Sequence, residues 1–371
     1  MFMPVNDQIQ PAKIKVLGIG GAGGNAVNRM ISYKFTGVDF ISINTDLQIL
    51  SLSKAPTKIQ IGRSIAKGLG GGGDPEIGKK AAEENKDEIK KVLEGSDLVF
   101  ITAGMGGATG TGASPVVAEI AKELGILTIA IVTRPFQFEG KKRNEAADIG
   151  IKKLKEIVDT MIVVPNEKLK MICDRSTPLN MLFESADNVL YQATKGISDV
   201  ITRPGYINRD FADVKSIMSH RGDAIIGVGS AKGDDKGASA AQIALDCPIL
   251  EDASIDKASA ILLSITGPER LAWGDVEDAI EIIKKRTNNN DINLTWGVIY
   301  DNNIEDEVRI TIVATGINSN VEKKPEKAEA LELFSENKDV KESLEDKFTV
   351  KRNYSKEEDI EKPAFLRRAS D

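Results

Sequence analysis

The chain has 371 residues and a formal net charge of −7, and 41% of its residues are hydrophobic while 5% are aromatic. This length exceeds the size at which one hydrophobic core keeps growing, so more than one folded domain is expected. The acidic balance and the few aromatic rings argue against a protein that binds nucleic acid or an anionic lipid surface.

The cysteines and the apolar runs indicate the cellular setting. Cys173 and Cys247 are the only cysteines, and they match no metal-binding or redox spacing. The first residues lack the pattern of a signal peptide, and the longest apolar runs, such as 126–132, have the length of strands. We therefore expect a cytoplasmic protein without direct membrane insertion. The single histidine, His220, is interpreted as an ordinary surface or packing residue.

The first half of the chain alternates between two periodicities. Patterns typical of strands cover 13–20, 38–46, 97–107, 126–135 and 159–168, and helical patterns cover 24–35, 75–95, 114–125 and 141–158. Alternation of this kind predicts an α/β, Rossmann-like domain over 12–176, in which helices cover both faces of a parallel sheet.

The second half contains three further segments. Residues 177–202 carry a sustained helical stripe, which opens at Thr177-Pro178 and predicts a long central helix. Residues 203–317 mix helical and strand patterns, as expected of a second, α+β domain. Residues 318–362 are highly charged with scattered apolar positions, which predicts a disordered linker before a short apolar tail at 363–371.

Three glycine-rich loops fall at predicted strand ends or helix starts. They lie at 20–24, 68–73 and 104–112, and the third also carries Thr109 and Thr111. Backbone N–H groups in such loops approach phosphate closely, and the helix that follows points its positive end at it. One loop is explained equally well by a tight turn, but three together predict a site for a polyphosphate.

Two more familiar phosphate motifs fit less well. Gly18, Gly20 and Gly23 have the spacing of a dinucleotide fingerprint, but Asp46 lies 28 positions after Gly18, where about 20 are expected. The segment at 73–80 lacks the Ser or Thr that a Walker motif needs for magnesium, so we interpret Pro75 as the start of a helix. An NAD-dependent two-domain enzyme therefore stays an alternative.

Several stretches resemble the tubulin/FtsZ superfamily of GTPases. "GMGGATGTGASPVVAEIAK" (104–122) is similar to the signature loop of that superfamily, and "GGAGGNAVNRM" (20–30) resembles the first loop of its bacterial FtsZ members. The resemblance continues through "NTD" (44–46), "FESADNVL" (183–190) and "GISDVITRPGYINRDFADV" (196–214), and it returns in "PAFLRR" (363–368). It implies the tubulin/FtsZ fold.

The resemblance also implies a site for GTP and GDP. The phosphates would face Gly20, Gly21, Gly24 and Asn25 of the first loop and Gly106, Gly107, Thr109, Gly110 and Thr111 of the third. The ribose or phosphates would contact Glu139 and Arg143, and guanine would contact Asn166, Phe183 and Asp187. The spacing agrees for the last pair, because residues four apart share a helix face and a carboxylate accepts both N–H groups of guanine. Core packing is the alternative for Phe183.

One position departs from the superfamily's pattern. Ala108 stands where the signature loop usually has glycine. If the position required a positive φ angle, alanine would cost about 1 kcal/mol, and phosphate affinity or turnover would fall.

An acidic segment follows the predicted long helix. Asp210 and Asp213 are expected to cap and open the next helix on sequence grounds alone. The resemblance instead assigns Asn208, Asp210 and Asp213 to a catalytic loop, where acidic groups position water and help hold Mg²⁺. A helix of about 25 residues spans roughly 37 Å, so these carboxylates are expected to serve the nucleotide of a neighbouring subunit.

That geometry predicts head-to-tail filaments in which assembly switches on hydrolysis. The resemblance adds a role in the division ring at mid-cell during bacterial cytokinesis. It also implies that Pro363–Arg368 docks to membrane-anchoring and regulatory division proteins. A filament scaffold that binds nucleotide with weak or no hydrolysis stays an alternative.

Overall fold

The computed structural model describes residues 12–317, apart from 172, 204, 208, 220, 221, 252–254, 288–291, 302 and 303. The first part contains β1 (Ile14–Ile19), α1 (Gly20–Ser32), β2 (Asp39–Asn44), α2 (Leu47–Ser51), β3 (Thr57–Gln60), α3 (Pro75–Glu84), α4 (Lys86–Leu93), β4 (Leu98–Gly104), α5 (Ala108–Glu123), β5 (Leu127–Arg134), η1 (Gln137–Glu139), α6 (Lys141–Lys155), β6 (Thr160–Pro165) and α7 (Asn166–Leu169). The second part contains α8 (Leu179–Thr202), β7 (Gly205–Ile207), α9 (Phe211–Met218), β8 (Asp223–Lys232), α10 (Lys236–Leu245), α11 (Pro248–Glu251), η2 (Ile255–Lys257), β9 (Ala260–Gly267), α12 (Trp273–Thr287), β10 (Asn293–Tyr300) and β11 (Glu307–Ile317).

The strands form one 11-stranded sheet in the order β3-β2-β1-β4-β5-β6-β8-β11-β9-β10-β7. From β3 to β6 every pairing is parallel, with Val16 of β1, for example, opposite Phe40 of β2 and Phe100 of β4. Beyond β8 the pairings are mostly antiparallel, and only β9 and β10 run parallel. The predicted parallel sheet is confirmed, and so is the mixed character of the second half.

Two predicted helices begin earlier in the chain than their apolar periodicity indicates. The helix predicted from residue 24 begins at Gly20, and the one predicted from residue 114 begins at Ala108. Small residues fill these first turns because the turns pack directly against each other. A Cβ atom on Gly20 would lie 2.9 Å from the backbone nitrogen of Gly110. The glycine-rich segments are therefore helix N-termini, which a hydrophobic pattern cannot reveal.

The helix predicted over 75–95 is in fact two helices. It breaks at Asn85, which ends α3 and immediately precedes α4, with φ −109° and ψ 23°. The expected start at Pro75 is confirmed, because Pro75 is the first residue of α3 and the Asp74 carboxylate accepts a hydrogen bond from the amide of Glu76. The Walker-like spacing at 73–80 thus belongs to an ordinary capped helix. The patterns did not predict β3 or α2, which are short.

Helices cover both faces of the parallel strands. One apolar cluster joins β1, β4 and β5 to α1 and α8 through Phe100, Val27 and Leu190. A second joins the other face to α3, α4 and α5 through residues such as Ile101 and Val117. A third cluster lies among β8, β9, β11, α10 and α12. The core thus follows the expected layering of an α/β sheet.

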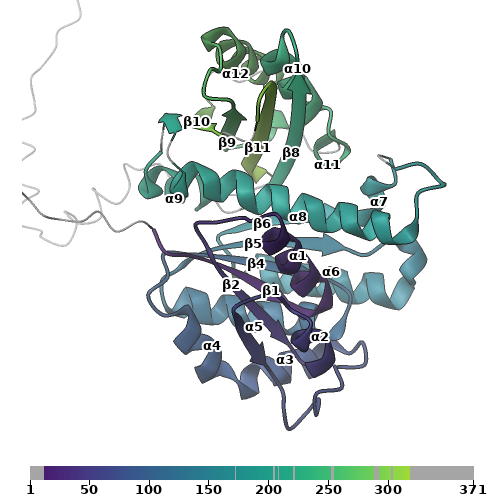
Figure 1. The fold of residues 1–371 in the computed structure, drawn as a ribbon. Helices are drawn as coiled ribbons and strands as arrows, with labels where there is room; N and C mark the ends of the chain where they lie inside the picture. The colour runs from purple at the N-terminus through teal and green to yellow at the C-terminus, as the bar shows by residue number, and fades with distance from the viewer. Residues whose placement is uncertain are drawn as a thin grey trace, which may run out of the picture. The chain divides into compact units, whose positions relative to one another are not determined.

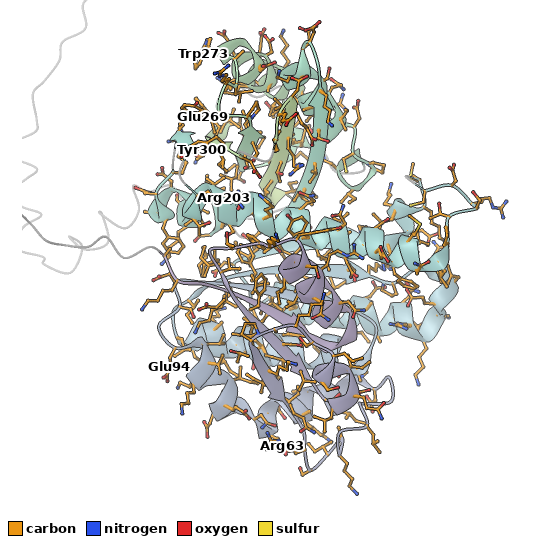
Figure 2. The ribbon with its side chains drawn as sticks, in the orientation of Figure 1. Arg63, Glu94, Arg203, Glu269, Trp273 and Tyr300 are labelled. Carbon is orange, nitrogen blue, oxygen red and sulfur yellow. The ribbon has the colours of Figure 1, made fainter. Side chains whose placement is uncertain are left out.

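The longest helix, α8, connects the two parts of the sheet. It packs against α1, β5 and β6, and also against β9, β10 and β11 (Figure 1). Ion pairs stabilise its last turns, because Asp199 pairs with both Lys195 and Arg203. Arg203 (Figure 2) also lies 3.6 Å from the Asp301 carboxylate, which follows β10. The position of α8 therefore determines where the chain that follows it begins.

Candidate functional site

A cavity of about 630 Å³ lies where the parallel strands β1, β2 and β4 end. Its wall is formed mainly by backbone and small side chains, among them Gly21, Gly106, Gly107, Thr109 and Gly110. All five belong to the phosphate-binding residues that the sequence predicts. The second glycine loop also reaches the cavity through residues 70–73, so the three loops converge on one site, as predicted.

The helices α1 and α5 begin at this cavity without side-chain caps, as does α6 (Lys141–Lys155). Neither α1 nor α5 has a side-chain hydrogen bond at its N-cap, and neither has an acidic residue in its first turn. The first backbone N–H groups of both helices therefore lack partners from their own helix, and both positive helix ends point toward the same space. Such a pair of helix ends suits an anion with several negative charges.

Basic residues also line the cavity. Lys141, Lys142 and Arg143 open α6 there, beside Glu139. Arg143 pairs with Glu139 at 3.1 Å, and Glu139 also accepts a hydrogen bond from the amide of Phe136 at 2.8 Å. Glu139 and Arg143 thus lie at the cavity as expected, whereas the two lysines were missed, although their basic run in the sequence signals them.

Three predicted phosphate residues lie behind the cavity wall. Gly20 has a φ of +75°, which favours glycine, and it packs against Gly110. Gly24 is buried near Ser42, and the Thr111 hydroxyl accepts a hydrogen bond from the amide of Gly106 at 2.8 Å. None of these three lines the cavity in the described structure, so each shapes the loops from behind.

The structure corrects the expectation of strain at Ala108. Ala108 is the first residue of α5, and it is not among the described non-glycine residues with positive φ. Its methyl group lies against the second glycine loop, because a Cβ atom on Gly71 would come within 2.5 Å of it. The glycine that this packing requires is therefore Gly71, and alanine at 108 adopts its backbone conformation without strain.

The predicted base-contacting residues lie on α7 and α8. Phe183 is 40% exposed and meets the Phe136 ring edge-on at 5.5 Å, so the alternative of core packing is wrong. Asn166 is 5% exposed, and its Oδ1 has no hydrogen-bond partner among the described residues. A buried acceptor of this kind is costly unless a ligand satisfies it.

A smaller cavity of about 350 Å³ contains the predicted carboxylate. Asn25 and Asp187 line it together with Arg29. Burial raises the pKa of Asp187 to about 7, and the nearby positive charge of Arg29 opposes that shift. Arg29 in turn pairs with Glu184 at 3.2 Å. Arg29 was missed because no motif in the sequence marks it.

The acidic segment lies beyond the other end of α8. The Asp210 carboxylate accepts a hydrogen bond from the amide of Asp213 at 2.7 Å, so Asp210 caps α9 as expected from the sequence. Both side chains are exposed, and Asp213 also lies 3.7 Å from Arg209. Neither lines the cavities described above. Asn208 lies outside the described residues, as do the predicted linker at 318–362 and the tail at Pro363–Arg368.

Asp46 has a local role that the NAD alternative did not consider. Its carboxylate accepts hydrogen bonds from the amides of Gln48 and Ile49 and so caps α2.

Two further features are absent from the described residues. No group of three or more His, Cys, Asp or Glu side chains is placed there to hold a metal ion, and none of the described helices has the length and apolar character of a membrane span.

Comparison with known proteins agrees with this architecture. Residues 13–174 match the profile of the Tubulin/FtsZ family GTPase domain, and residues 222–318 match that of the FtsZ family C-terminal domain. A structure of an empty FtsZ dimer from M. jannaschii is 44% identical, with a TM-score of 0.80 over 84% of this chain and 90% of that one. A structure of a mutant form of M. jannaschii FtsZ is also 44% identical, with a TM-score of 0.80 over 83% of this chain and 92% of that one.

More distant proteins share the fold. A GTPγS-bound protofilament of CetZ2 from Haloferax volcanii is 19% identical, with a TM-score of 0.70 over 90% of this chain and 99% of that one. The three converging loops, the long α8 and the two matched profiles lead to one conclusion: the chain belongs to the Tubulin/FtsZ family of GTPases.

Proposed function

We propose that the chain binds GTP in the cavity at the strand ends and hydrolyses it within head-to-tail filaments, where the acidic segment of the next subunit completes the site. The observation that carries this proposal is the separation of two functional regions by α8. The anion-binding cavity lies at the ends of β1, β2 and β4, and the carboxylates of Asp210 and Asp213 lie beyond the C-terminal end of α8.

The phosphate site is supported by its supply of donors. The uncapped N-termini of α1 and α5 offer backbone N–H groups, and Lys141, Lys142 and Arg143 in the cavity lining offer positive charge. The CetZ2 protofilament that shares this fold is GTPγS-bound, and the matched GTPase-domain profile supports the same ligand class here. On this proposal the nucleotide's phosphates face Gly21, Gly107 and Gly110, and its ribose lies near Glu139 and Arg143.

The guanine site is supported by two acceptors, the buried Asn166 and the half-buried Asp187. Asn166 Oδ1 has no described partner, and Asp187 lines a cavity next to Asn25 and Arg29. A carboxylate accepts from both N1–H and the 2-amino group of guanine, and an amide oxygen accepts one further donor. The half-exposed face of Phe183 is available for stacking against the base. Together these groups distinguish guanine from adenine.

Distance supports hydrolysis between subunits. The 24 residues of α8 span about 36 Å. If Phe183 and Asp187 hold the base near the start of this helix, Asp210 of the same subunit lies too far away to act on the phosphates. A neighbour stacked head-to-tail brings its own Asp210 and Asp213 to the cavity, and repetition of that contact produces a filament.

The acidic side chains of the proposed site provide the ligand type that Mg²⁺ prefers. Mg²⁺ prefers oxygen ligands and is commonly held by one or two carboxylates together with phosphate oxygens. The exposed carboxylates of Asp210 and Asp213 are of the right type, and so is Asp46 in the cavity wall. On this proposal Mg²⁺ neutralises phosphate charge when it is bound, while the two aspartates orient the attacking water.

The cellular role is proposed on family grounds. We propose that the filaments form in the cytoplasm and build the division ring at mid-cell.

Pro363–Arg368 is proposed to dock to a membrane-anchoring division protein, since the sequence joins Phe365 and Leu366 to two arginines. Deletion of residues 362–371 should leave GTP turnover unchanged and abolish binding to such an adaptor, measured by pull-down. Unchanged binding would refute the docking role.

The decisive experiment measures GTP turnover against protein concentration, with sedimentation in parallel. Hydrolysis between subunits predicts that turnover per chain is near zero in dilute protein and rises steeply where polymer first sediments. Turnover per chain that stays constant across this range would show that each subunit hydrolyses its own nucleotide. Nucleotide binding without turnover at any concentration would instead support the scaffold alternative.

A further inference from the structure

Thr45 and Thr109 share a hydrogen bond in the cavity wall. Their hydroxyl oxygens lie 2.7 Å apart, and the two residues are only 0% and 8% exposed. Thr45 follows β2 and Thr109 is the second residue of α5. We propose that Thr45 is a positioning residue: its hydroxyl orients Thr109 toward the nucleotide's phosphates and couples the phosphate site to the exposed segment around α2. This inference rests on the proposed GTP site.

The direction of the hydrogen bond follows from proton counting. Each threonine hydroxyl has one proton and two lone pairs, so one of the two must donate to the other. A phosphate oxygen can only accept. When Thr109 donates its proton to a phosphate, its bond to Thr45 therefore has to be donated by Thr45. Without Thr45, the Thr109 hydroxyl would lose the partner that fixes its rotamer.

Thr109 is held from the other side by the first loop. A Cβ atom on Gly20 would lie 3.4 Å from Cβ of Thr109, so the N-terminal turn of α1 packs against it. Thr45 is fixed by its own chain, since Asn44 Oδ1 accepts a hydrogen bond from the amide of Asp46 at 3.1 Å. The hydrogen bond between the two hydroxyls therefore connects the N-terminal turn of α5 to the segment that follows β2, and a displacement of either segment is passed to the other.

The residues after Thr45 lead from the cavity to the surface. Asp46 caps α2 and also forms an isolated bridge with Leu69. The amide of Leu47 donates to the carbonyl of Gly68 at 3.0 Å, which ties α2 to the second glycine loop. Thr45 therefore immediately precedes a structural unit, formed by Asp46, α2 and the second glycine loop, in which backbone contacts hold α2 to that loop.

This unit carries apolar side chains on its surface. We call Leu47, Ile49, Leu52 and Leu69 the α2 patch, and they are 51%, 42%, 74% and 81% exposed. Exposed apolar groups that cluster beside a site are typical of a contact surface. Ile49 also lines the cavity, so a neighbouring subunit that covers the cavity also covers this patch. We infer that the occupant is the next copy of the chain, and that the hydroxyl pair links nucleotide binding to assembly.

The test compares Thr45→Val, which keeps the shape and removes the hydroxyl, with Thr45→Ser, which keeps the hydroxyl. GTP affinity is measured at concentrations too low for assembly, and the critical concentration by sedimentation. Thr45→Val should weaken GTP binding roughly fivefold and raise the critical concentration at least as much, while Thr45→Ser retains most of both. Thr45→Ala replaces Thr45→Val if that variant does not fold.

A double-mutant cycle separates positioning from general stability. If Thr45 acts through Thr109, the variant Thr45→Val/Thr109→Val should bind GTP as Thr109→Val alone does. The matched control is Thr128→Val, because Thr128 is 2% exposed and its hydroxyl donates to the carbonyl of Ile126 at 3.0 Å, in β5. This control should change neither GTP affinity nor critical concentration.

The inference would be overturned by Thr45→Val equal to wild type, by Thr45→Ser as weak as Thr45→Val, or by fully additive losses in the double variant. A loss in Thr128→Val as large as that in Thr45→Val would also show a merely structural role. Failure of the GTPase proposal is a separate outcome, because wild-type protein would then neither bind GTP nor assemble with it.

Discussion

The two ends of α8 are built in opposite ways. At the cavity, the groups that face an anion are mostly backbone, supplied by uncapped helices such as α1 and α5 and by glycine loops. Beyond the last turn of α8, the chemistry depends on two exposed side chains, Asp210 and Asp213. A backbone N–H donor is not removed by replacing a side chain, whereas a site made of two carboxylates is lost with one of them. Binding and hydrolysis should therefore be separable by mutation.

The largest effect is expected at the carboxylate end. Asp210→Asn keeps a good N-cap for α9 and removes the negative charge, so it separates capping from catalysis. We expect GTP binding to be unchanged and turnover to fall about 100-fold or more. Mixed with wild-type protein, the variant should slow turnover out of proportion to its share, because each defective subunit spoils a neighbour's site.

The control for this experiment is Asp246→Asn, which removes another exposed carboxylate, after α10. It should leave turnover near the wild-type value. Wild-type turnover in pure Asp210→Asn would remove Asp210 from the mechanism and leave it the capping role alone.

The second-largest effect is expected at Asp187, the side chain on which guanine recognition depends. Asp187→Asn replaces an acceptor of two guanine N–H groups with an amide, so GTP affinity should fall about 10- to 100-fold. Xanthosine triphosphate carries a carbonyl in place of the 2-amino group, and the new amide can donate to it. The variant should therefore prefer that nucleotide, measured by competition. A variant that keeps the wild-type preference for GTP would place the base elsewhere.

A smaller, pH-dependent effect follows from the same carboxyl group. Burial raises its pKa to about 7 in the unliganded protein, while guanine needs the ionised form, so binding GTP releases a proton. Affinity should therefore fall as pH falls through 7, by about tenfold between pH 8 and pH 6. The phosphates also titrate in this range, so Asp187→Asn is the control, and its affinity should change less. Equal slopes in both proteins would contradict the assignment.

The contrast between the two ends also explains what the sequence could predict. The alternating patterns predicted the parallel sheet, and the three glycine loops predicted one shared anion site, because loops at the carboxyl ends of parallel strands meet at one edge. The start of α5 was placed six residues late, since glycine and threonine carry no apolar periodicity. The break at Asn85 was missed for a similar reason, as apolar residues continue on both sides of it.

Tertiary contacts account for the remaining surprises in the site. The bond between Thr45 and Thr109 joins residues 64 positions apart, and nothing local marks either as a partner. The raised pKa of Asp187 depends on how deeply α1 and α8 bury it, which a helical pattern does not specify. Capping by Asp210 was predictable because an N-cap needs only its own four residues.

The smallest effect is expected for a substitution at Ala108, which lies in the wall of the cavity. A family glycine at this position suggested that Ala108→Gly would relieve strain and leave turnover equal or faster. The helical backbone of Ala108 now removes the strain, and its methyl group packs against the second glycine loop. We therefore expect Ala108→Gly to lower the free energy of unfolding by about 0.5–1 kcal/mol without a gain in turnover, measured by denaturant titration and phosphate release. Ala118→Gly, in the interior of the same helix, should cost at least as much. A clear rise in turnover for Ala108→Gly alone would mean that this methyl group restrains the phosphate loops, and that the cavity end, too, depends on a single side chain.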